Sequence, residues 1–196
     1  MNVTIKPLTP ELAADYFDFF EKRAFTDDSP YRCYCQVYQM TKEQYQATYN
    51  DAVKNPGPAS RAEAERQIIN GVLRGYLAYV DEMAVGWCNT NDRANYPVAP
   101  YYDDVHFHAP AEAKEKAVVC FEIAPKYRGK GIATALLQRV VFDAEAEGYL
   151  GVVGFPVVRA ERYEWDCQGP IRLYEKAGFI KVAEEGSAIV MRKGLK

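Results

Sequence analysis

The stretch Phe121-Glu-Ile-Ala-Pro-Lys-Tyr-Arg-Gly-Lys-Gly-Ile-Ala-Thr-Ala-Leu-Leu137 is the most informative part of this 196-residue chain. It predicts a short apolar strand ending at Ala124-Pro125, a basic turn over residues 128–131, and an amphipathic helix that begins at once. The first N–H groups of a helix lack intrahelical partners and carry a partial positive charge, so they suit a phosphate or pyrophosphate. Glycines at the turn let a ligand approach the backbone closely. The stretch therefore predicts an anion-binding strand–turn–helix unit.

The spacing of the turn narrows the kind of site. It matches neither a Walker loop, which ends in Gly-Lys-Ser/Thr, nor the dinucleotide fingerprint GxGxxG. At this point the alternative interpretation, a plain turn between a strand and a helix that binds no ligand, is not yet decided against. The pattern Arg/Gln-x-x-Gly-x-Gly/Ala is met by Arg128, Gly131 and Ala133. After a strand that ends near Pro125, this pattern resembles the coenzyme A loop of the GNAT superfamily of acyl-CoA-dependent N-acyltransferases.

A second segment, Gly169-Pro-Ile-Arg-Leu-Tyr-Glu-Lys-Ala-Gly-Phe179, resembles the late helix of the same family, which ends in Tyr-Glu-Lys-x-Gly-Phe. The two motifs stand in the family's order. The resemblance covers residues 72–192, and residues 1–70 match only in outline. The late helix departs from the family pattern, since Cys167 stands where many members have asparagine and Pro170 where many have alanine. The cofactor contact of that asparagine is therefore not carried over.

Composition and charge bound the class of protein. Hydrophobic residues make up 48% and charged residues 26%, as in an ordinary globular protein, and the length predicts one domain over residues 1–196. No apolar run reaches the roughly 20 residues that span a bilayer, and the N-terminus lacks a signal-peptide layout. We therefore expect a cytoplasmic protein without membrane attachment. A net charge of −3 argues against nucleic-acid binding and suits an amine substrate. The sequence does not determine the oligomeric state, and a homodimer is one of the alternatives.

The cysteines and histidines invite a metal interpretation, which their spacing disfavours. Zinc modules have two to four residues between paired cysteines, whereas Cys33-Tyr-Cys35 and His106-Phe-His108 have a single residue between the pair. Residues two apart in a strand share one face, so packing explains both pairs. We expect no bound metal. The five cysteines are expected to be reduced thiols, because no secretion signal is present in the sequence.

Periodicity and turn residues predict the secondary structure. The expected strands cover residues 3–8, 75–80, 83–89, 117–124, 150–158, 179–182 and 188–192, and the helices 10–23, a stretch from 41, 59–72, 132–147 and 170–176. Asp81-Glu82 joins two strands as a hairpin, Thr41 begins a capping box, and Gly148 ends a helix. Residues 90–115 are predicted to form a long loop. The helix over 59–72 is expected to bury Ala62, Ile68, Ile69 and Val72.

The resemblance implies an α/β (α+β) chain with the GNAT fold, a mixed, mostly antiparallel splayed sheet flanked by helices. Acyl-CoA enters where the fourth and fifth strands part, here around residues 117–124 and 150–156. The family transfers an acyl group from the thioester to an amine without a covalent enzyme intermediate. Acetyl-CoA is thus the expected co-substrate, and the N–H of Ile123 is expected to meet the thioester oxygen. The residues expected to hold the pyrophosphate are Arg128, Gly129, Lys130, Gly131, Ile132 and Ala133.

Two residues are candidates for proton transfer. Tyr174 lies where many family members have a tyrosine facing the sulfur, so the resemblance implies that it protonates the departing thiolate; simple packing is the alternative. Glu122 interrupts an apolar strand and is the candidate base, with a pair to Lys or Arg as the alternative. A carboxylate with a pKa of about 4.3 falls about 8 kcal/mol short of deprotonating an ammonium at about 10.4. Glu122 therefore needs a raised pKa, a relaying water or an unusually acidic ammonium. Cys120 and Cys167 are expected to be structural.

The acceptor is expected to bind outside the two motifs, at residues 25–40, 90–115 and 159–168. Aromatic and acidic side chains that could line its pocket are Tyr31, Tyr34, Tyr101, Tyr102, Trp165, Asp27, Asp28, Asp103 and Asp104. The sequence thus predicts an acetyl-CoA-dependent N-acetyltransferase that acts on a primary amine of a small molecule, rather than of a peptide or protein. The alternative is a catalytically silent acyl-CoA-binding domain. A plain α/β domain with an incidental glycine turn is the third hypothesis.

Overall fold

The computed structural model describes residues 1–25, 33–49, 57–97, 105–158 and 167–196. Within these residues, seven strands form one sheet in the order β1-β2-β3-β4-β5-β7-β6. The strands are β1 (Thr4–Pro7), β2 (Gly75–Val80), β3 (Met83–Asp92), β4 (Glu115–Ile123), β5 (Gly151–Gly154), β6 (Ile180–Glu185) and β7 (Ala188–Gly194). Neighbouring strands are antiparallel except β4 and β5, which are parallel. The predicted mixed, mostly antiparallel sheet is confirmed.

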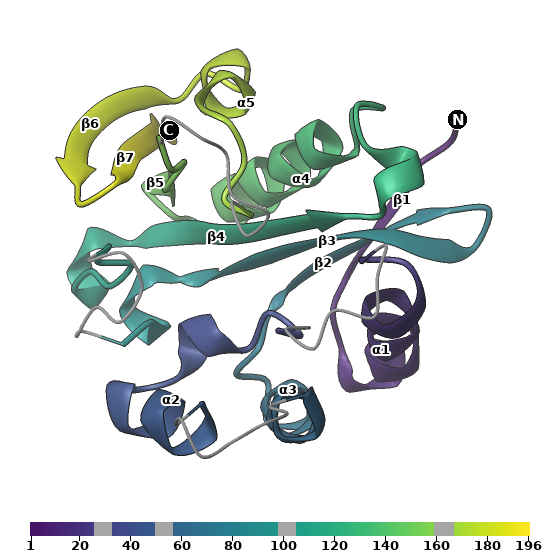
Figure 1. Cartoon of the computed structure of the whole chain (residues 1–196). Coiled ribbons are helices and arrows are strands. Elements are labelled where there is room, and N and C mark those ends of the chain that lie inside the picture. The colour runs from purple at the N-terminus through teal and green to yellow at the C-terminus, as the bar shows by residue number, and fades with distance from the viewer. Residues whose placement is uncertain (26–32, 50–56, 98–104, 159–166) are drawn as a thin grey trace.

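Helices cover both faces of this sheet. The α-helices of the described residues are α1 (Ala13–Lys22), α2 (Lys42–Thr48), α3 (Gly57–Ile69), α4 (Ile132–Ala146) and α5 (Ile171–Lys176). Short 3-10 turns lie at η1 (Pro10–Leu12), η2 (Val37–Gln39), η3 (Arg93–Asn95), η4 (Ala111–Ala113) and η5 (Pro125–Tyr127). Figure 1 shows α4 on one face of the sheet and α1 and α3 on the other. Among the residues that the structure describes, no helix is long and apolar enough to cross a membrane.

Two adjacent residues of β3, Gly86 and Trp87, contact the helices on the two faces of the sheet. A Cβ on Gly86 would lie 2.9 Å from Cγ2 of Ile132, so only a glycine lets the start of α4 seat directly on the sheet. Trp87 points to the opposite layer, where its ring centroid lies 5.0 Å from that of Tyr16 in α1, edge to face. Both rings are fully buried. The start of α4 is therefore fixed by direct contact with a central strand.

Several local predictions are confirmed. Asp81 and Glu82 adopt left-handed backbone angles, with φ of 49° and 63°, as a two-residue turn between twisted strands requires. Thr41 caps α2 in a reciprocal box in which its hydroxyl accepts from Gln44 N–H at 3.2 Å, and the Gln44 side chain accepts from Thr41 N–H at 2.8 Å. Gly148 follows α4 with a φ of 78°, the left-handed conformation that ends a helix.

The buried face of α3 differs from the prediction. Ile69 is 63% exposed and Val72 38% exposed, and Ala62 is exposed as well, so only Ile68 of the predicted set is buried. The inward face also carries a polar residue, because the Gln67 amide donates to the backbone oxygen of Gln36 at 3.2 Å. The remaining inward residues of α3 are Ser60 and Ala64.

The predicted loop over 90–115 and the strand over 150–158 are also corrected. β3 continues to Asp92, and the hydroxyl of Thr90 donates to Ala117 O of β4 at 2.7 Å, so a polar stretch forms part of a strand. The rest of the described part of that loop contains η3 and η4. β5 covers only Gly151–Gly154, and beyond it Val157 makes one isolated bridge to Ala188.

Candidate functional site

β4 and β5 lie side by side only near their beginnings. Their register runs from Glu115 opposite Gly151 to Val118 opposite Gly154, and β4 then continues to Ile123 paired with β3 but no longer with β5. Part of the open edge is covered by the segment before α5, since Phe121 N–H donates to Cys167 O at 2.6 Å. The sheet thus parts between the two strands that the sequence predicts, as can be followed in Figure 1.

A cleft of about 590 Å³ lies at this parting. It is lined by the end of β4, by η5 and the glycine turn, by the start of α4, and by residues from Cys167 into α5. Every residue predicted to bind the cofactor lines the cleft except Lys130, whose Nζ lies 5.2 Å from the centroid of the Tyr127 ring. The structure therefore brings the two sequence motifs together around one space.

The glycine turn opens into this cleft. Gly129 and Gly131 have left-handed φ values of 72° and 83°, and a Cβ on either would meet no atom within 4 Å. Gly131 is the N-cap residue of α4, and its carbonyl accepts the first intrahelical bond, from Ala135 N–H at 3.0 Å. The amides of the first turn that precede Ala135 have no carbonyl one turn back to bind. Because Ile132 and Ala133 line the cleft, this helix start presents its donors and its positive end toward an anion there.

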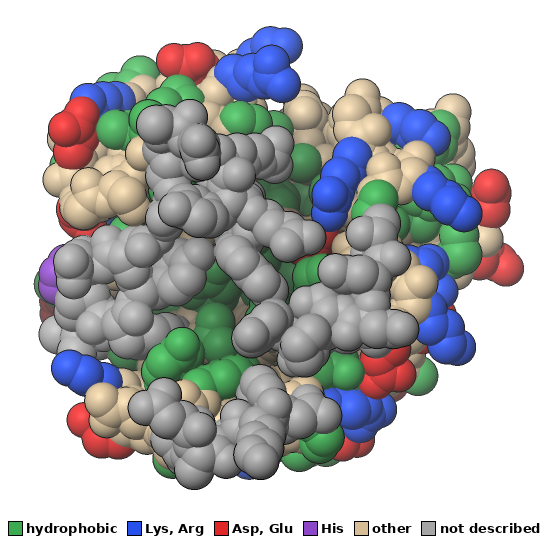
Figure 2. Space-filling model, viewed as in Figure 1, with side chains coloured by type: hydrophobic (Ala, Val, Ile, Leu, Met, Phe, Trp, Pro, Cys, Tyr) green, Lys and Arg blue, Asp and Glu red, His purple; other side chains and the backbone are tan. Residues whose placement is uncertain are grey.

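Cationic side chains surround the same opening. Arg128 lines the cleft from one side, and Arg172 and Lys176 line it from α5, one helical turn apart. Figure 2 shows Lys and Arg side chains over η5 and the start of α4, and also over α5. In a protein with a net charge of −3, this local excess of positive charge favours a polyanionic ligand at the cleft.

The amide of Ile123 points to the open edge of β4. Successive N–H groups of a strand point to alternate sides, and Ala124 N–H donates to Val85 O of β3 at 2.9 Å. Phe121 N–H points the other way, to Cys167 O. Ile123 N–H, two residues after Phe121, therefore points toward the cleft, which Ile123 lines. Its part in binding a thioester oxygen stays a prediction.

Glu122 lines the cleft with a side chain that is only 15% exposed. Arg128 donates to its carboxylate at 3.0 Å and to Ile123 O at 2.8 Å. Burial raises the pKa of Glu122 to about 7, against the opposing effect of the Arg128 charge. A base at this pKa falls about 5 kcal/mol short of deprotonating an ordinary ammonium, instead of about 8. The sequence analysis gave two alternatives for Glu122, a base with a raised pKa or a partner of Lys or Arg. In the structure Glu122 has both the raised pKa and the arginine partner.

Tyr174 lies behind the wall of the cleft. Its side chain is fully buried, its hydroxyl donates to Gln168 O at 2.7 Å, and it is not among the described residues that line the cleft. Burial raises the pKa of Tyr174 well above its usual range. In this structure the hydroxyl fixes the segment before α5, and the predicted role as proton donor to the thiolate stays a prediction.

Cys167, which the sequence predicts to be structural, lies in the wall of the cleft. Its thiol is partly exposed and lines the cleft, whereas Cys35, Cys88 and Cys120 are buried. The Tyr38 hydroxyl lies 3.0 Å from the Cys167 sulfur. A hydrogen bond with Cys120 lowers the pKa of the Cys167 thiol, burial raises it, and the bond with Tyr38 lowers it further. The available sequence signal was the departure from the family motif at this position.

Most residues named for the acceptor pocket lie outside the described part of the chain, namely Tyr31, Tyr101, Tyr102, Trp165, Asp27, Asp28, Asp103 and Asp104. Tyr34 is described and is 6% exposed, with its ring 5.9 Å from that of Phe17, so it packs in the core. Among the residues that the structure describes, no three His, Cys, Asp or Glu side chains are grouped so as to hold a metal ion.

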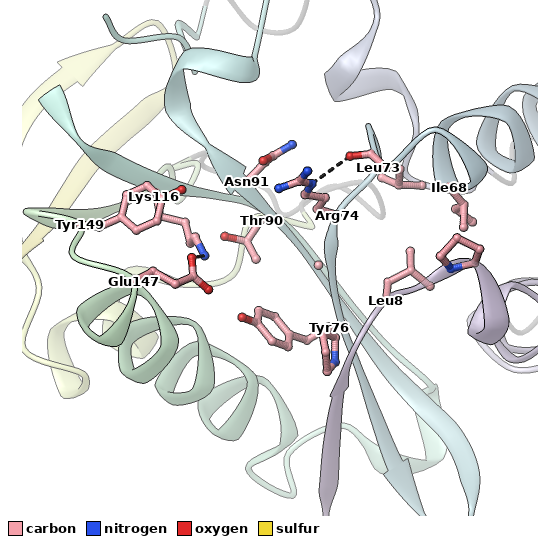
Figure 3. A pocket seen from close by; sticks show the side chains of 14 residues that line it. Leu8, Ile68, Leu73, Arg74, Tyr76, Thr90, Asn91, Lys116, Glu147 and Tyr149 are labelled. Carbon is pink, nitrogen blue, oxygen red and sulfur yellow. Dashed lines mark hydrogen bonds and ion pairs between the residues drawn. The ribbon is translucent and has the colours of Figure 1, made fainter. Parts of the chain in front are cut away.

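A second cavity, of about 220 Å³, shares no lining residue with the cleft within the described ranges. Figure 3 shows Lys116 and Glu147 pointing toward one another at its wall, where the ammonium lies 2.6 Å from the carboxylate. Arg74 Nε donates to Gly71 O at 2.8 Å, and Tyr76 donates to Asp143 at 2.7 Å. These polar groups bind one another or nearby backbone, so the first cleft is the stronger candidate site.

Comparison with protein families matches the chain to the model of the acetyltransferase (GNAT) domain over residues 72–181. The chain belongs to the GNAT acetyltransferase family. The matched region of this GNAT acetyltransferase includes every described residue that lines the cleft. Comparison with curated proteins gave no match.

Solved structures share the fold at low sequence identity. PaiA N-acetyltransferase from Thermoplasma acidophilum, in complex with coenzyme A, is 16% identical with a TM-score of 0.57, over 99% of each chain. A phosphinothricin acetyltransferase from Sinorhizobium meliloti, in complex with acetyl-CoA, is 17% identical with a TM-score of 0.56, over 100% of this chain and 89% of that one. The YncA protein of Salmonella typhimurium, with acetyl-CoA, is 14% identical with a TM-score of 0.53, over 99% and 94%. These likenesses confirm the GNAT fold of this acetyltransferase.

Proposed function

We propose that this GNAT acetyltransferase binds acetyl-CoA in the cleft and transfers the acetyl group to a primary amine of a small molecule. One observation carries the proposal: a helix start with two left-handed glycines opens into a 590 Å³ cleft beside the parted strand β4. The similar folds that hold coenzyme A or acetyl-CoA support the choice of ligand.

In this proposal the two ends of the cleft have separate tasks. The first-turn amides of α4, with Arg172 and Lys176 across the opening, bind the phosphate groups. Ile123 N–H, on the open edge of β4, donates to the thioester oxygen, on which negative charge develops during transfer. The phosphate end and the reacting end thus lie on consecutive segments, β4 and the turn that follows it.

Glu122 is the proposed base for the incoming amine. An amine must lose a proton to become a nucleophile, and a carboxylate whose pKa lies near 7 exists in both protonation states at neutral pH. Its small exposed fraction, 15%, favours a slender amine that can enter the cleft over a lysine held on a folded protein surface. The net charge of −3 favours a cationic acceptor.

The experiment has two stages. Coenzyme A is titrated into the protein during thermal unfolding, where ligand at a hundred times its dissociation constant adds about 2.7 kcal/mol of stability. Release of free thiol from acetyl-CoA is then measured across a panel of small amines and peptides. Binding without thiol release for any amine would favour the silent acyl-CoA-binding domain. A protein that coenzyme A does not stabilise would refute the cleft assignment.

A further inference from the structure

The second cavity lies at the opposite end of α4 from the cleft. Its space of about 220 Å³ is lined by Glu147, the residue that caps the C-terminus of α4, and by Lys116 near the start of β4. The cleft is lined by the other ends of the same two elements, Ile132 of α4 and Ile123 of β4. The proposed acetyl transfer uses no residue of the second cavity. A ligand in this cavity would therefore bind apart from the acetyl donor and its acceptor.

One side of the second cavity carries charged groups. The Lys116 side chain is only 9% exposed, and its ammonium lies 2.6 Å from Oε2 of Glu147 and 4.8 Å from the centroid of the Tyr149 ring. The other carboxylate oxygen of Glu147 has no hydrogen-bond partner among the described residues. Within the same residues only Nε of Arg74 is bonded, to Gly71 O at 2.8 Å, so both terminal amino groups of the guanidinium can bind a ligand.

The other side of the second cavity is apolar. Figure 3 shows Leu8 and Ile68 across the cavity from Lys116 and Glu147. The side chain of Ile68 is 2% exposed, so it belongs to a fixed wall. Other polar groups of the lining are already bonded, since Tyr76 donates to Asp143 at 2.7 Å and Thr90 donates to Ala117 O at 2.7 Å. The groups left to recognise a ligand are thus the Arg74 donors, one Glu147 oxygen and an apolar wall.

The volume of the second cavity limits the size of the ligand. A cavity of about 150 Å³ holds benzene, and drug-sized ligands occupy about 300 Å³ or more. A volume of about 220 Å³ therefore suits a short aliphatic chain with a polar head. An α-amino acid has this form and carries both charges on its head. Its carboxylate matches the planar fork of Arg74, and its ammonium matches Glu147.

We propose that the second cavity binds a free α-amino acid with an aliphatic side chain, which acts as an effector of the acetyltransferase. The carboxylate binds Arg74, the ammonium binds Glu147, and the side chain packs against Ile68. The Lys116–Glu147 pair joins the start of β4 to the end of α4, so a ligand that binds Glu147 acts on both elements that build the cleft. Binding of the amino acid is independent of the proposed function, and only its effect on the cleft rests on that function.

The first experiment compares ligands that differ by one charged group. L-Leucine is titrated calorimetrically into the protein without coenzyme A, beside isocaproate, which lacks the ammonium, and isoamylamine, which lacks the carboxylate. L-Leucine should bind at least about tenfold more tightly than either, because each analogue loses a hydrogen bond between charged groups. L-Valine and L-isoleucine are titrated as well, to include the other aliphatic side chains of similar size.

Variants assign the binding to the second cavity. Arg74→Gln and Glu147→Gln should each weaken L-leucine binding at least about tenfold. Arg66→Gln and Glu145→Gln are the matched controls, because both residues are exposed nearby in the sequence but do not line the cavity, and they should bind as the wild type does. Glu122→Gln should also bind L-leucine as the wild type does, which separates this site from an acceptor site in the cleft.

The second experiment measures the effect on the cleft. The dissociation constant of coenzyme A, titrated with and without saturating L-leucine, should change at least about fivefold, and coenzyme A should change the affinity for L-leucine by the same factor. An unchanged affinity for coenzyme A would refute the effector role.

Three other results bear on the inference. It is overturned if none of the three amino acids binds, if isocaproate binds as tightly as L-leucine, or if Arg74→Gln leaves the binding unchanged. Each of these leaves the proposed function standing. A protein that binds L-leucine but not coenzyme A would instead refute the proposed function and leave the amino-acid site standing.

Discussion

Replacing Glu122 with glutamine should stabilise the protein in a way that depends on pH. The pKa of this buried carboxyl is raised from an ordinary value of 4.5 to about 7. The folded state therefore binds the proton more tightly than the unfolded state, and the contribution of Glu122 to the free energy of unfolding falls as the pH rises from 4.5 to 7 and is constant above that. With a pKa of 4.5 in the unfolded state and about 7 in the folded state, the ionised Glu122 lowers the free energy of unfolding by about 3 kcal/mol at pH 8 and by about 1 kcal/mol at pH 5. Glu122→Gln removes this penalty.

Urea unfolding of both proteins at pH 5 and pH 8 measures the effect. The stability of Glu122→Gln relative to the wild type should increase by about 2 kcal/mol between the two pH values. Arg128 loses its partner in the variant, but its side chain is 58% exposed and stays hydrated. Asp18→Asn is the control, because the hydrogen bond from Lys22 lowers the pKa of that carboxyl, and its removal should cost the same stability at both pH values. A Glu122→Gln effect that is equal at pH 5 and pH 8 would refute the buried, proton-binding carboxyl.

Three further substitutions, the first with a matched control at Gly148, test other parts of the site. Gly131→Ala and Gly148→Ala both force alanine to a left-handed φ, 83° and 78°, and each should lower the free energy of unfolding by about 1 kcal/mol, but only Gly131→Ala should also weaken coenzyme A binding in a titration. Equal binding by the two variants would contradict the anion site at α4. Tyr174→Phe removes the bond to Gln168 O and should cost about 1 kcal/mol in urea unfolding; if the predicted catalytic role holds, thiol release should also slow at least about tenfold, and unchanged release would leave Tyr174 a packing residue. Gly154→Ala places a Cβ 2.0 Å from Cε1 of Tyr174 and should cost about 1–3 kcal/mol, whereas wild-type stability would show that α5 can shift.

The parts of the fold that depend on local sequence were predictable. The hairpin at Asp81-Glu82, the cap at Thr41 and the end of α4 at Gly148 each follow from the conformational preferences of a few neighbouring residues. The buried face of α3 was not predictable in this way. An apolar pattern favours Ile69, but the helix is oriented by tertiary contacts that bury Gln67 against the backbone of Gln36. The extension of β3 through Thr90 to Asp92 likewise depends on its partner strand, which a polar stretch does not reveal.

The part of the candidate site that lies within the two sequence motifs was predictable. The glycine turn, Ile123 and Glu122 lie together in the cleft because β4 leads directly into the turn. The orientation of the Tyr174 hydroxyl toward Gln168 O, and that of the Tyr38 hydroxyl toward Cys167, involve segments that approach only in the folded chain. The raised pKa of Glu122 was stated as a requirement for catalysis, and the burial that produces it became visible only in the structure.

The early parting of β4 from β5 leaves main-chain groups in the middle of a sheet without a neighbouring strand. Among the described residues, Cys167 O takes the place of a strand partner for Phe121 N–H alone, and Ile123 N–H, two residues farther along, faces the cleft. A ligand with amide groups along its length would then act as the absent strand segment and would join the two halves of the sheet mechanically. Amide hydrogen exchange at Ile123 should slow on ligand binding, and so should exchange in β7 on the far side of the parting.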